Sequence, residues 1–348
     1  MNVGSISLFS GCGGMDIGSI KAGVPVILST DFDENCINTL KANDEFAESM
    51  IIKSDIRGLT ADSFKEAISI AVPSKLILIG GPPCQPFSKA GYWITNSARK
   101  GVDDNRNMIG DYLRILRELT PDGFIFENVE SLLHPTNKKA VDIIISFISK
   151  MNYDYKLVKA YALDYGVPQK RRRIFIVGSR KKFQSEEPQK THCSPENCNS
   201  NGLIPYESVG KYIHKYSGQE FFEPEEVTSL GTYAKELEEI PPGKNYFALT
   251  ERDGYPNPRF KANKRFWSFL LKLHPDMPSW TISAQPGPWV GPFHWTSRRL
   301  RVPEIAAIQT FPENYKFIGS RRAIQRQIGN AVPPLMAKTI VQFLKENL

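Results

Sequence analysis

Short runs of apolar residues alternate with longer amphipathic stretches along the first 180 residues of the chain. The apolar runs have the length and composition of buried β-strands, and they lie at residues 6–9, 26–28, 50–53, 76–79, 124–126 and 174–177. Stretches between them, such as residues 111–118 and 139–151, have the periodicity of helices that bury one face. This alternation predicts an α/β layered fold with a mainly parallel sheet.

The pattern changes after about residue 180. Residues 184–210 are polar and rich in Pro, Ser and Asn, which is typical of a linker or an irregular entry to a second lobe. Residues 246–299 are aromatic and basic, and beyond residue 312 the spacing of Met336, Ile340, Phe343 and Leu344 predicts an amphipathic helix. We therefore expect a catalytic domain of residues 1–181, completed by residues 312–348, and a second domain of residues 182–311. The aromatic residues of the second domain are expected mostly in its core.

The two halves of the chain differ in charge. Residues 1–168 hold 17 Lys and Arg against 20 Asp and Glu, whereas residues 169–348 hold 27 against 17. A near-neutral half joined to a basic half fits a catalytic lobe beside a lobe that binds a polyanion. There is no apolar run of membrane-spanning length and no signal-peptide pattern, and the five scattered cysteines do not suggest a disulfide framework. A reducing cytoplasm is the expected compartment.

A glycine-rich turn follows the first expected strand. Gly11 and Gly13 permit positive φ angles and a close approach of the backbone to a ligand. Asp31, 18 residues after Gly13, is placed to bind ribose hydroxyls; Phe32 could stack on an adenine, and Asp55 could accept from its amino group. These residues suggest a nucleotide-like cofactor, although a plain tight turn is an open alternative. A nicotinamide cofactor is disfavoured because the full G-x-G-x-x-G spacing is lacking.

A proline-rich loop with one cysteine follows the expected strand at residues 76–79. Its sequence is Gly80-Gly-Pro-Pro-Cys-Gln-Pro-Phe-Ser88, and it lies where open α/β sheets bind their ligands. Prolines restrict the backbone, so such a loop holds Cys84 in a fixed direction. A lone cysteine is usually a buried apolar residue, but this setting favours a nucleophile.

Five motifs together resemble those of the DNA cytosine-5 methyltransferases of bacterial restriction-modification systems. They are Phe9-Ser-Gly-Cys-Gly-Gly14, Gly81-Pro-Pro-Cys-Gln85, Glu127-Asn-Val129, Gln169-Lys-Arg-Arg-Arg173 and Gly329-Asn-Ala-Val-Pro-Pro334. The resemblance extends in the family's order from Ser5 to about Leu335 and weakens between about residues 184 and 278. It implies a Rossmann-like, S-adenosylmethionine-dependent methyltransferase sheet with a smaller domain for DNA recognition.

The resemblance also implies a mechanism. The Cys84 thiolate would add to carbon 6 of a cytosine flipped out of the duplex, which makes carbon 5 nucleophilic enough to take a methyl group. Glu127, at the end of an apolar strand, would protonate or hydrogen-bond ring nitrogen N3. Arg173 would bind O2 of the cytosine. Strand alternation sends Arg171 to the same side as Arg173, where Arg171 would help to place the catalytic residues. The alternative is that this basic run only contacts phosphate, as Lys170 and Arg172 could.

Other ligand contacts follow from the same resemblance. S-adenosyl-L-methionine is the expected methyl donor, with S-adenosyl-L-homocysteine as the product and no metal. The expected cofactor contacts are Phe9, Gly11, Gly13, Gly14, Asp31, Phe32, Asp55, Ile56, Gly81, Pro83 and Asn330. The expected DNA contacts are Gln85, Ser88, Arg106, Gln169 and Arg298. Residues 85–105 are expected to form a mobile loop that closes over DNA.

Three departures or alternatives bear on this hypothesis. Arg301 and Pro303 stand where the family commonly has Thr and Arg, which puts the local phosphate contacts in question. His192, Cys193 and Cys198 invite a zinc site, but no fourth ligand has suitable spacing. A tRNA cytosine methyltransferase on the same fold is a rival, although the Cys-Phe-Thr signature of that branch is absent.

The remaining alternative is a catalytically inactive DNA-binding regulator, against which the intact Cys84, Glu127 and Arg173 argue. Expected partners are double-stranded DNA and a functionally paired restriction endonuclease. We expect a monomer in the bacterial cytoplasm, associated with DNA and not with a membrane.

Overall fold

The computed structural model describes residues 2–83, 108–198, 202–263 and 266–348. At its centre is a seven-stranded sheet. Its strands are, in spatial order, β3 (Met50–Lys53), β2 (Val26–Asp31), β1 (Val3–Leu8), β4 (Lys75–Gly80), β5 (Gly123–Val129), β8 (Arg172–Ser179) and β6 (Asp154–Tyr161). Neighbouring strands from β3 to β5 are parallel, whereas β8 is antiparallel to both β5 and β6. The predicted α/β fold with a mainly parallel sheet is confirmed.

Strand β6 is the member of this sheet that no apolar run indicated. Among its eight residues only Val158 and Ala160 are buried. The strand lies at the edge of the sheet and buries one face, so apolar and polar residues alternate along it instead of forming a continuous run. Each of the other six strands overlaps the apolar run that predicted it, with the ends shifted by a few residues; Phe9, the last residue of the first run, lies just beyond β1.

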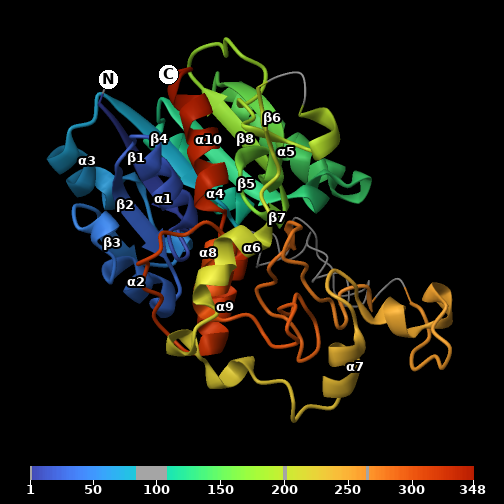
Figure 1. Ribbon diagram of the computed structural model, residues 1–348. Coiled ribbons are helices and arrows are strands. Elements are labelled where there is room, and N and C mark those ends of the chain that lie inside the picture. Colours follow the sequence, from blue (N-terminus) through green and yellow to red (C-terminus); the bar gives the residue numbers. More distant parts are fainter. Residues whose placement is uncertain (1, 84–107, 199–201, 264–265) are drawn as a thin grey trace.

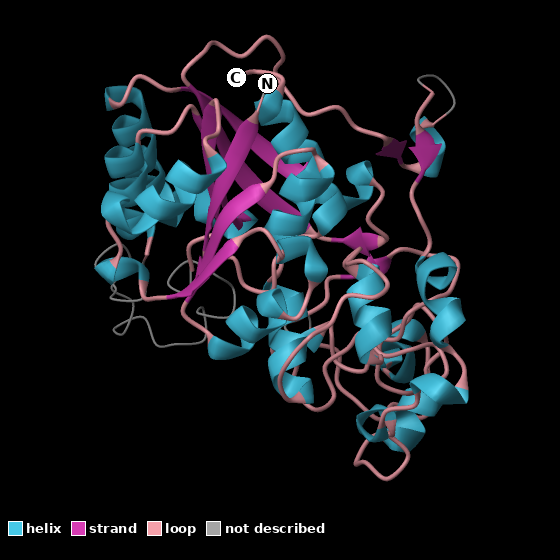
Figure 2. Ribbon diagram, turned by 90° about the vertical axis from the view of Figure 1, so that its left-hand side faces the viewer, coloured by secondary structure: helices cyan, strands magenta, loops and turns pink. Residues whose placement is uncertain are grey.

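Helices cover both faces of the sheet, and the strands supply alternate residues to the two layers (Figures 1 and 2). One layer includes Leu78 and Phe126 of the sheet, packed against α3 (Lys65–Ala71), α4 (Ile109–Leu119) and α5 (Lys138–Lys150). The opposite layer includes Ile77 and Ile125, packed against α1 (Gly14–Lys21) and α10 (Pro334–Lys345). Both faces are therefore buried, as the apolar strand sequences predicted.

The C-terminal helix α10 completes the first lobe. Met336, Ile340, Phe343 and Leu344 are all buried, so the predicted amphipathic face is confirmed. Helices α1 and α10 lie side by side (Figure 1), and Gly18 permits their close contact. A Cβ atom on Gly18 would lie 2.3 Å from the Cβ of Ala337.

A third core joins the two ends of the chain. It packs Ile17 of α1 and Leu40 of α2 (Glu34–Lys41) against apolar residues of α6 (Val209–Ile213), α8 (Val302–Ile308) and α9 (Arg321–Asn330). This core contains residues from both sides of the expected domain boundaries. No helix in the described ranges is long and apolar enough to cross a membrane.

The second lobe has little regular structure. Its elements are β7 (Gln169–Lys170) paired with β11 (Ser279–Trp280), β9 (His192–Cys193) paired with β10 (Ile204–Pro205), and α7 (Ala234–Glu239). A small core holds it together, comprising Leu237, Ile240, Tyr246, Leu249, Leu270 and Phe293, with partly buried aromatic rings around them. Many aromatics do pack together, but Trp267, Trp280, Trp289 and Trp295 are all at least partly exposed.

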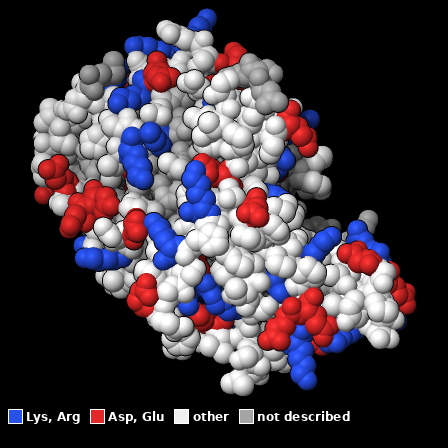
Figure 3. Space-filling view, in the orientation of Figure 1, with Lys and Arg blue, Asp and Glu red and all other residues white. Residues whose placement is uncertain are grey.

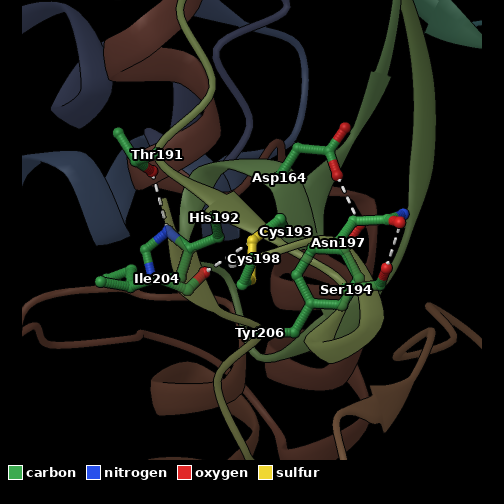
Figure 4. The surroundings of a disulfide bond; sticks show 9 residues. All are labelled: Asp164, Thr191, His192, Cys193, Ser194, Asn197, Cys198, Ile204 and Tyr206. Carbon is green, nitrogen blue, oxygen red and sulfur yellow. Dashed lines mark hydrogen bonds between the residues drawn. A yellow bond between two sulfur atoms is a disulfide. The ribbon is translucent and has the colours of Figure 1, made fainter. Parts of the chain in front are cut away.

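A disulfide joins Cys193 and Cys198 (Figure 4), which the scattered cysteine positions did not suggest. The turn at residues 195–197 brings the two Cα atoms to 5.5 Å, so a short sequence separation is sufficient. His192 points elsewhere, with its Nδ1 2.8 Å from the Thr191 hydroxyl. No group of three or more potential metal ligands occurs in the described part of the chain.

Candidate active site

The carboxyl ends of β1, β4 and β5 meet at one edge of the sheet. Leu8, at the end of β1, is paired with Gly80 of β4, and Gly80 is paired with Phe126 of β5. The glycine-rich turn and the cysteine loop come at the ends of β1 and β4, and Glu127 lies near the carboxyl end of β5, directly after Phe126. Because open α/β sheets bind ligands at this edge, it is the candidate active site.

The turn after β1 is held by Asp31 of the neighbouring strand. The Gly11 N–H donates to Asp31 Oδ2 (2.8 Å), and the Asp33 N–H donates to Oδ1 (2.8 Å). Gly11 and Gly13 have φ angles of 56° and 81°, in the region that favours glycine. A Cβ atom on Gly11 would have no neighbour within 4 Å, so the space beside this turn is open to a ligand.

The ends of β2 and β3 border the same opening. Phe32, directly after β2, is 72% exposed, and burial raises the pKa of the neighbouring Asp31. Asp55 accepts a hydrogen bond from the Arg57 N–H (3.0 Å) and pairs with the Arg57 guanidinium. Ile56 is buried beneath them. An exposed ring beside two carboxylates at adjacent strand ends is the arrangement that the sequence predicted for a nucleoside.

Asp16 is a buried acid that the sequence analysis did not single out. It accepts hydrogen bonds from Ser7 Oγ (2.9 Å) and Ser29 Oγ (2.7 Å), and burial raises its pKa to about 6. It therefore ties α1 to β1 and β2 beneath the glycine turn. An acid in the first turn of a helix usually indicates a charge near the N-terminus, which hid this role.

Glu127 and Arg173 form an ion pair at the sheet edge. The Arg173 Nε lies 2.9 Å from Glu127 Oε1, and both side chains are largely buried. Burial raises the pKa of Glu127, and the cations of Arg173 and Arg171 oppose this shift. The pair can therefore present both a proton donor and a cation to one ligand.

Gly81 provides the room for this carboxylate. A Cβ atom on Gly81 would lie 2.6 Å from Glu127 Oε2. Asn128 Nδ2 donates to the Pro82 carbonyl (3.2 Å), which joins the loop after β4 to the end of β5. Pro83 ends this described stretch, and Cys84, Gln85, Ser88 and Arg106 lie outside the described residues.

The expectation that Arg171 lies on the same side as Arg173 and helps to place the catalytic residues stays a prediction. Arg171 is fully buried, and its charge, like that of Arg173, opposes the rise in the pKa of Glu127. Its buried Nη2 donates to the carbonyls of Gly329 (2.9 Å) and Ala331 (2.9 Å). Arg171 therefore fastens the catalytic strand to the joint between α9 and α10.

The chain belongs to an established family. The family model of the C-5 cytosine-specific DNA methylases matches residues 3–346. The chain is a member of this family. It is thus a DNA cytosine-5 methyltransferase, and the match favours DNA over the tRNA alternative.

Curated relatives cover nearly the whole methylase chain. It is 38% identical to the Type II methyltransferase M.SacI of Streptomyces achromogenes, over 99% of this chain and 93% of the relative. It is 31% identical to the Type II methyltransferase M.NgoPII of Neisseria gonorrhoeae, over 99% of this chain and 95% of the relative.

Solved structures share the fold of the methylase at lower identity. Spodoptera frugiperda DNMT2 matches with a TM-score of 0.64 at 17% identity, over 98% of this chain and 99% of the other. Entamoeba histolytica methyltransferase EhMeth matches with a TM-score of 0.64 at 16% identity, over 99% of this chain and 98% of the other.

Two of the expected DNA contacts of the methylase, Gln169 and Arg298, lie in the described residues, as does Asn330, the last of the expected cofactor contacts. Gln169 is fully buried, and its amide is bonded to Gln309 Oε1 (2.9 Å) and the Ile282 N–H (3.1 Å). This side chain is therefore structural in the described conformation and is not available to DNA. Arg298 is partly exposed and bonded to both carboxylate oxygens of Glu304. Asn330 is exposed at the end of α9.

Proposed function

We propose that the protein is a sequence-specific modification methyltransferase of the Type II kind, which extrudes one cytosine from duplex DNA and methylates its carbon 5. The observation that carries the proposal is the Glu127–Arg173 pair, with Nε and Oε1 2.9 Å apart beside Gly81. Gly81 belongs to the cysteine loop, and Cys84 follows it by three residues in the sequence. The names of the relatives M.SacI and M.NgoPII support the assignment to this kind of enzyme.

The residues at the ends of β1, β2 and β3 fit S-adenosyl-L-methionine. Phe9, Gly11 and Gly13 have positive φ angles, and the space beside Gly11 is open, whereas Gly13 and Gly14 pack closely against other residues of the protein. The backbone from Phe9 to Gly14 is the proposed cofactor contact, and the exposed Phe32 ring offers a stacking surface for the adenine. The remaining proposed contacts are Asp31 for the ribose, Asp55 and Ile56 for the adenine, and Gly81, Pro83 and Asn330. When bound, the cofactor supplies a methyl group on a positively charged sulfur and leaves as S-adenosyl-L-homocysteine.

Cys84 is the proposed nucleophile. Its sulfur forms a bond to carbon 6 of the cytosine, and the displaced electron pair makes carbon 5 reactive. That pair forms the bond to the methyl group. A base then takes the carbon 5 proton, the electron pair of the broken carbon–hydrogen bond re-forms the double bond between carbons 5 and 6, and the sulfur–carbon bond breaks to release the Cys84 thiolate. Covalent addition thus replaces one difficult step with several easier ones.

Glu127 and Arg173 stabilise the charge that this addition places on the ring. Because burial raises the pKa of Glu127, its carboxyl group can donate a proton to N3 as Cys84 attacks. The Arg173 guanidinium binds O2, where negative charge accumulates. Arg171 acts as a positioning residue, since its Nη2 is bound to the backbone at Gly329 and Ala331.

Double-stranded DNA is the proposed partner, and the second lobe is its proposed recognition domain. Extrusion of a base costs a few kcal/mol, which contacts to phosphates and bases must offset. Both signs of charge occur side by side over the second lobe in Figure 3, so its basic excess is not one continuous patch on this face. Arg298 remains a proposed DNA contact, as do Gln85, Ser88 and Arg106 in the cysteine loop and beyond it.

The enzyme is further proposed to work as a monomer in the bacterial cytoplasm, paired in function with a restriction endonuclease. It needs no metal in this mechanism. These statements follow from the family resemblance and from the Type II names of the relatives.

The test is to sequence bisulfite-treated plasmid DNA from cells that express the protein. We expect protected cytosines at one position of one short sequence. The matched variant Cys84→Ser should give no protected cytosine while DNA binding persists, because a hydroxyl is a far weaker nucleophile than a thiolate.

A covalent adduct with DNA that contains 5-fluorocytosine should form with the wild-type protein alone. Fluorine cannot leave carbon 5 as a proton does, so Cys84 stays bound to the ring. Protected cytosines in the Cys84→Ser sample, or no trapped wild-type adduct under turnover conditions, would contradict the proposed nucleophile.

A further inference from the structure

A lysine and two tryptophans form a ridge where β7 meets the second lobe. The parallel pairing of β7 and β11 places Trp280 opposite Lys170, and the Lys170 Nζ lies 4.1 Å from the centroid of the Trp280 ring. Trp267 packs edge-on against Trp280, with ring centroids 4.9 Å apart. We call Lys170, Trp267 and Trp280 the Lys–Trp ridge.

The position of the ridge is fixed by the backbone. Thr281 Oγ1 donates to the Lys170 carbonyl (2.6 Å), and the Ser279 N–H donates to the Pro168 carbonyl (2.8 Å). These bonds anchor the second lobe to the segment that leads into Arg173. A side chain on this segment is therefore held at a defined place beside the catalytic pair.

The charge of Lys170 is not neutralised within the protein. Lys170 forms no ion pair with any described carboxylate, and burial lowers its pKa with no acidic neighbour opposing the shift. Several other cations around the two lobes are paired, namely Arg173 with Glu127, Arg298 with Glu304, Arg301 with Glu226, Arg321 with Glu223 and Lys215 with Glu313. Lys170 thus presents an unpaired ammonium group on a rigid aromatic support.

The ridge is accessible and close to the site. Lys170 is half-buried and lies three residues before Arg173, while Trp267 is 43% exposed and the adjacent Phe266 is 58% exposed. Figure 1 places β7 where the sheet of the first lobe meets the second lobe. A ligand that spans both lobes beside Glu127 and Arg173 would therefore pass the ridge.

We propose that the Lys–Trp ridge binds the sugar–phosphate backbone of DNA next to the extruded cytosine. This inference rests on the proposed function. The Lys170 ammonium group donates to a phosphate oxygen, and Trp267 covers the neighbouring sugar. Trp280 holds the lysine in place, so little side-chain freedom is lost on binding. The unpaired cation and the exposed apolar rings match the charge and the sugar of a nucleic-acid backbone.

The test compares the salt dependence of DNA binding by the wild-type protein and by Lys170→Gln. Binding is measured between 50 and 200 mM salt, with S-adenosyl-L-homocysteine present, on a plasmid fragment that the wild-type protein methylates. Loss of one phosphate contact should make the slope of log K against log salt less steep by about 0.9. The ratio of the wild-type affinity to the Lys170→Gln affinity should therefore be about 3.5-fold larger at 50 mM salt than at 200 mM salt.

Two variants separate a phosphate contact from a structural role. Lys170→Arg keeps the charge and should keep the slope, and Lys159→Gln removes an exposed lysine of β6 and should also leave it unchanged. Trp267→Ala should weaken binding severalfold without altering the slope, because its contact is not ionic. If the slope for Lys170→Gln equals the wild-type slope, the proposed contact of Lys170 with phosphate is wrong. If Trp267→Ala binds DNA as tightly as the wild type, the proposed contact of Trp267 with the sugar is wrong.

The experiment distinguishes a wrong assignment of the Lys–Trp ridge from a wrong proposed function. If the wild-type protein methylates no DNA, the proposed function fails before the ridge is tested. If the wild-type protein methylates DNA and Lys170→Gln lowers only its melting temperature, Lys170 is structural and the proposal is wrong.

Discussion

At the scale of single residues, the site combines groups that are costly to bury. Burial raises the pKa of Glu127, and the guanidinium groups of Arg173 and Arg171 oppose this shift in part. Such an arrangement lowers the free energy of unfolding at neutral pH, but it keeps a proton available on the carboxyl group for chemistry. The buried Nη2 of Arg171, by contrast, donates to backbone carbonyls, so Arg171 and Arg173 have different roles.

Replacing Glu127 by Gln should separate activity from stability. We expect turnover to fall about 10²- to 10⁴-fold, the usual contribution of a general acid. A carboxyl group whose pKa is raised on folding contributes stability at low pH, which is lost as pH rises through the folded pKa. The melting temperature of Glu127→Gln should therefore equal or exceed that of the wild type at pH 8, with the difference shrinking toward pH 4.

Glu130→Gln is the matched control for this substitution. Glu130 is exposed three residues further along the chain, and its replacement should change neither turnover nor the pH dependence of melting. Full activity of Glu127→Gln would remove this residue from the mechanism. A lower melting temperature at pH 8 would instead show that the ion pair with Arg173 outweighs the burial of the carboxylate.

At the scale of elements, close contact between α1 and α10 closes the first lobe. Gly18 contributes through its lack of a side chain, and Tyr315 adds a hydrogen bond from its hydroxyl to the Cys12 carbonyl (2.7 Å). The turn that shapes the proposed cofactor site is thereby supported by residues about 300 positions away in the sequence. The cofactor end of the enzyme depends on the C-terminal segment.

Two glycines in helices should respond oppositely to alanine. Gly18→Ala would place a Cβ atom 2.3 Å from the Cβ of Ala337, and overpacking of this kind costs about 1–3 kcal/mol. A Cβ atom on Gly110 of α4 would have no neighbour within 4 Å, so Gly110→Ala should stabilise the protein by about 0.5–1 kcal/mol. Urea unfolding of both variants measures this contrast, and a Gly18→Ala protein as stable as the wild type would show that the helices can separate at no cost.

At the scale of the whole molecule, buried charges join the second lobe to the helices beneath it. Arg301 is buried at the start of α8, where it pairs with both oxygens of Glu226 and donates to the Tyr216 and Gly218 carbonyls. At this position the sequence departs from the family pattern. Arg301 points inward and is not placed to contact a phosphate; it joins the start of α8 to Tyr216, Gly218 and Glu226.

Removing one member of this pair should destabilise the protein strongly. Arg301→Ala leaves Glu226 buried without its partner, which typically costs about 3–5 kcal/mol. Urea unfolding of Arg301→Ala, Glu226→Ala and the double variant measures the effect. The double variant should lose much less than the sum of the two single losses, because it leaves no unpaired charge. Additive losses would show that the two side chains act independently.

The sequence by itself determined six strands, the helices that cover them and the order of the motifs. Buried strands and amphipathic helices have local signatures, because each residue's burial follows from its place in a short repeat. The glycine turn, Asp31 and Glu127 were also predictable, since they lie near the carboxyl ends of strands whose ends must meet at one edge. The role of Cys84 rests on its motif and lies outside the described residues.

Only the tertiary structure decided the partners of the buried polar groups. Gln169 and Arg171 belong to a motif that suggested DNA and substrate contacts, yet they bind Gln309 and Gly329, which are more than 130 residues away in sequence. Sequence analysis also did not predict three other features, namely the edge strand β6, the Cys193–Cys198 disulfide and the contact of Lys170 with the Trp280 ring. Each depends on which distant segments pack together, and hydrophobic periodicity carries no information about that choice.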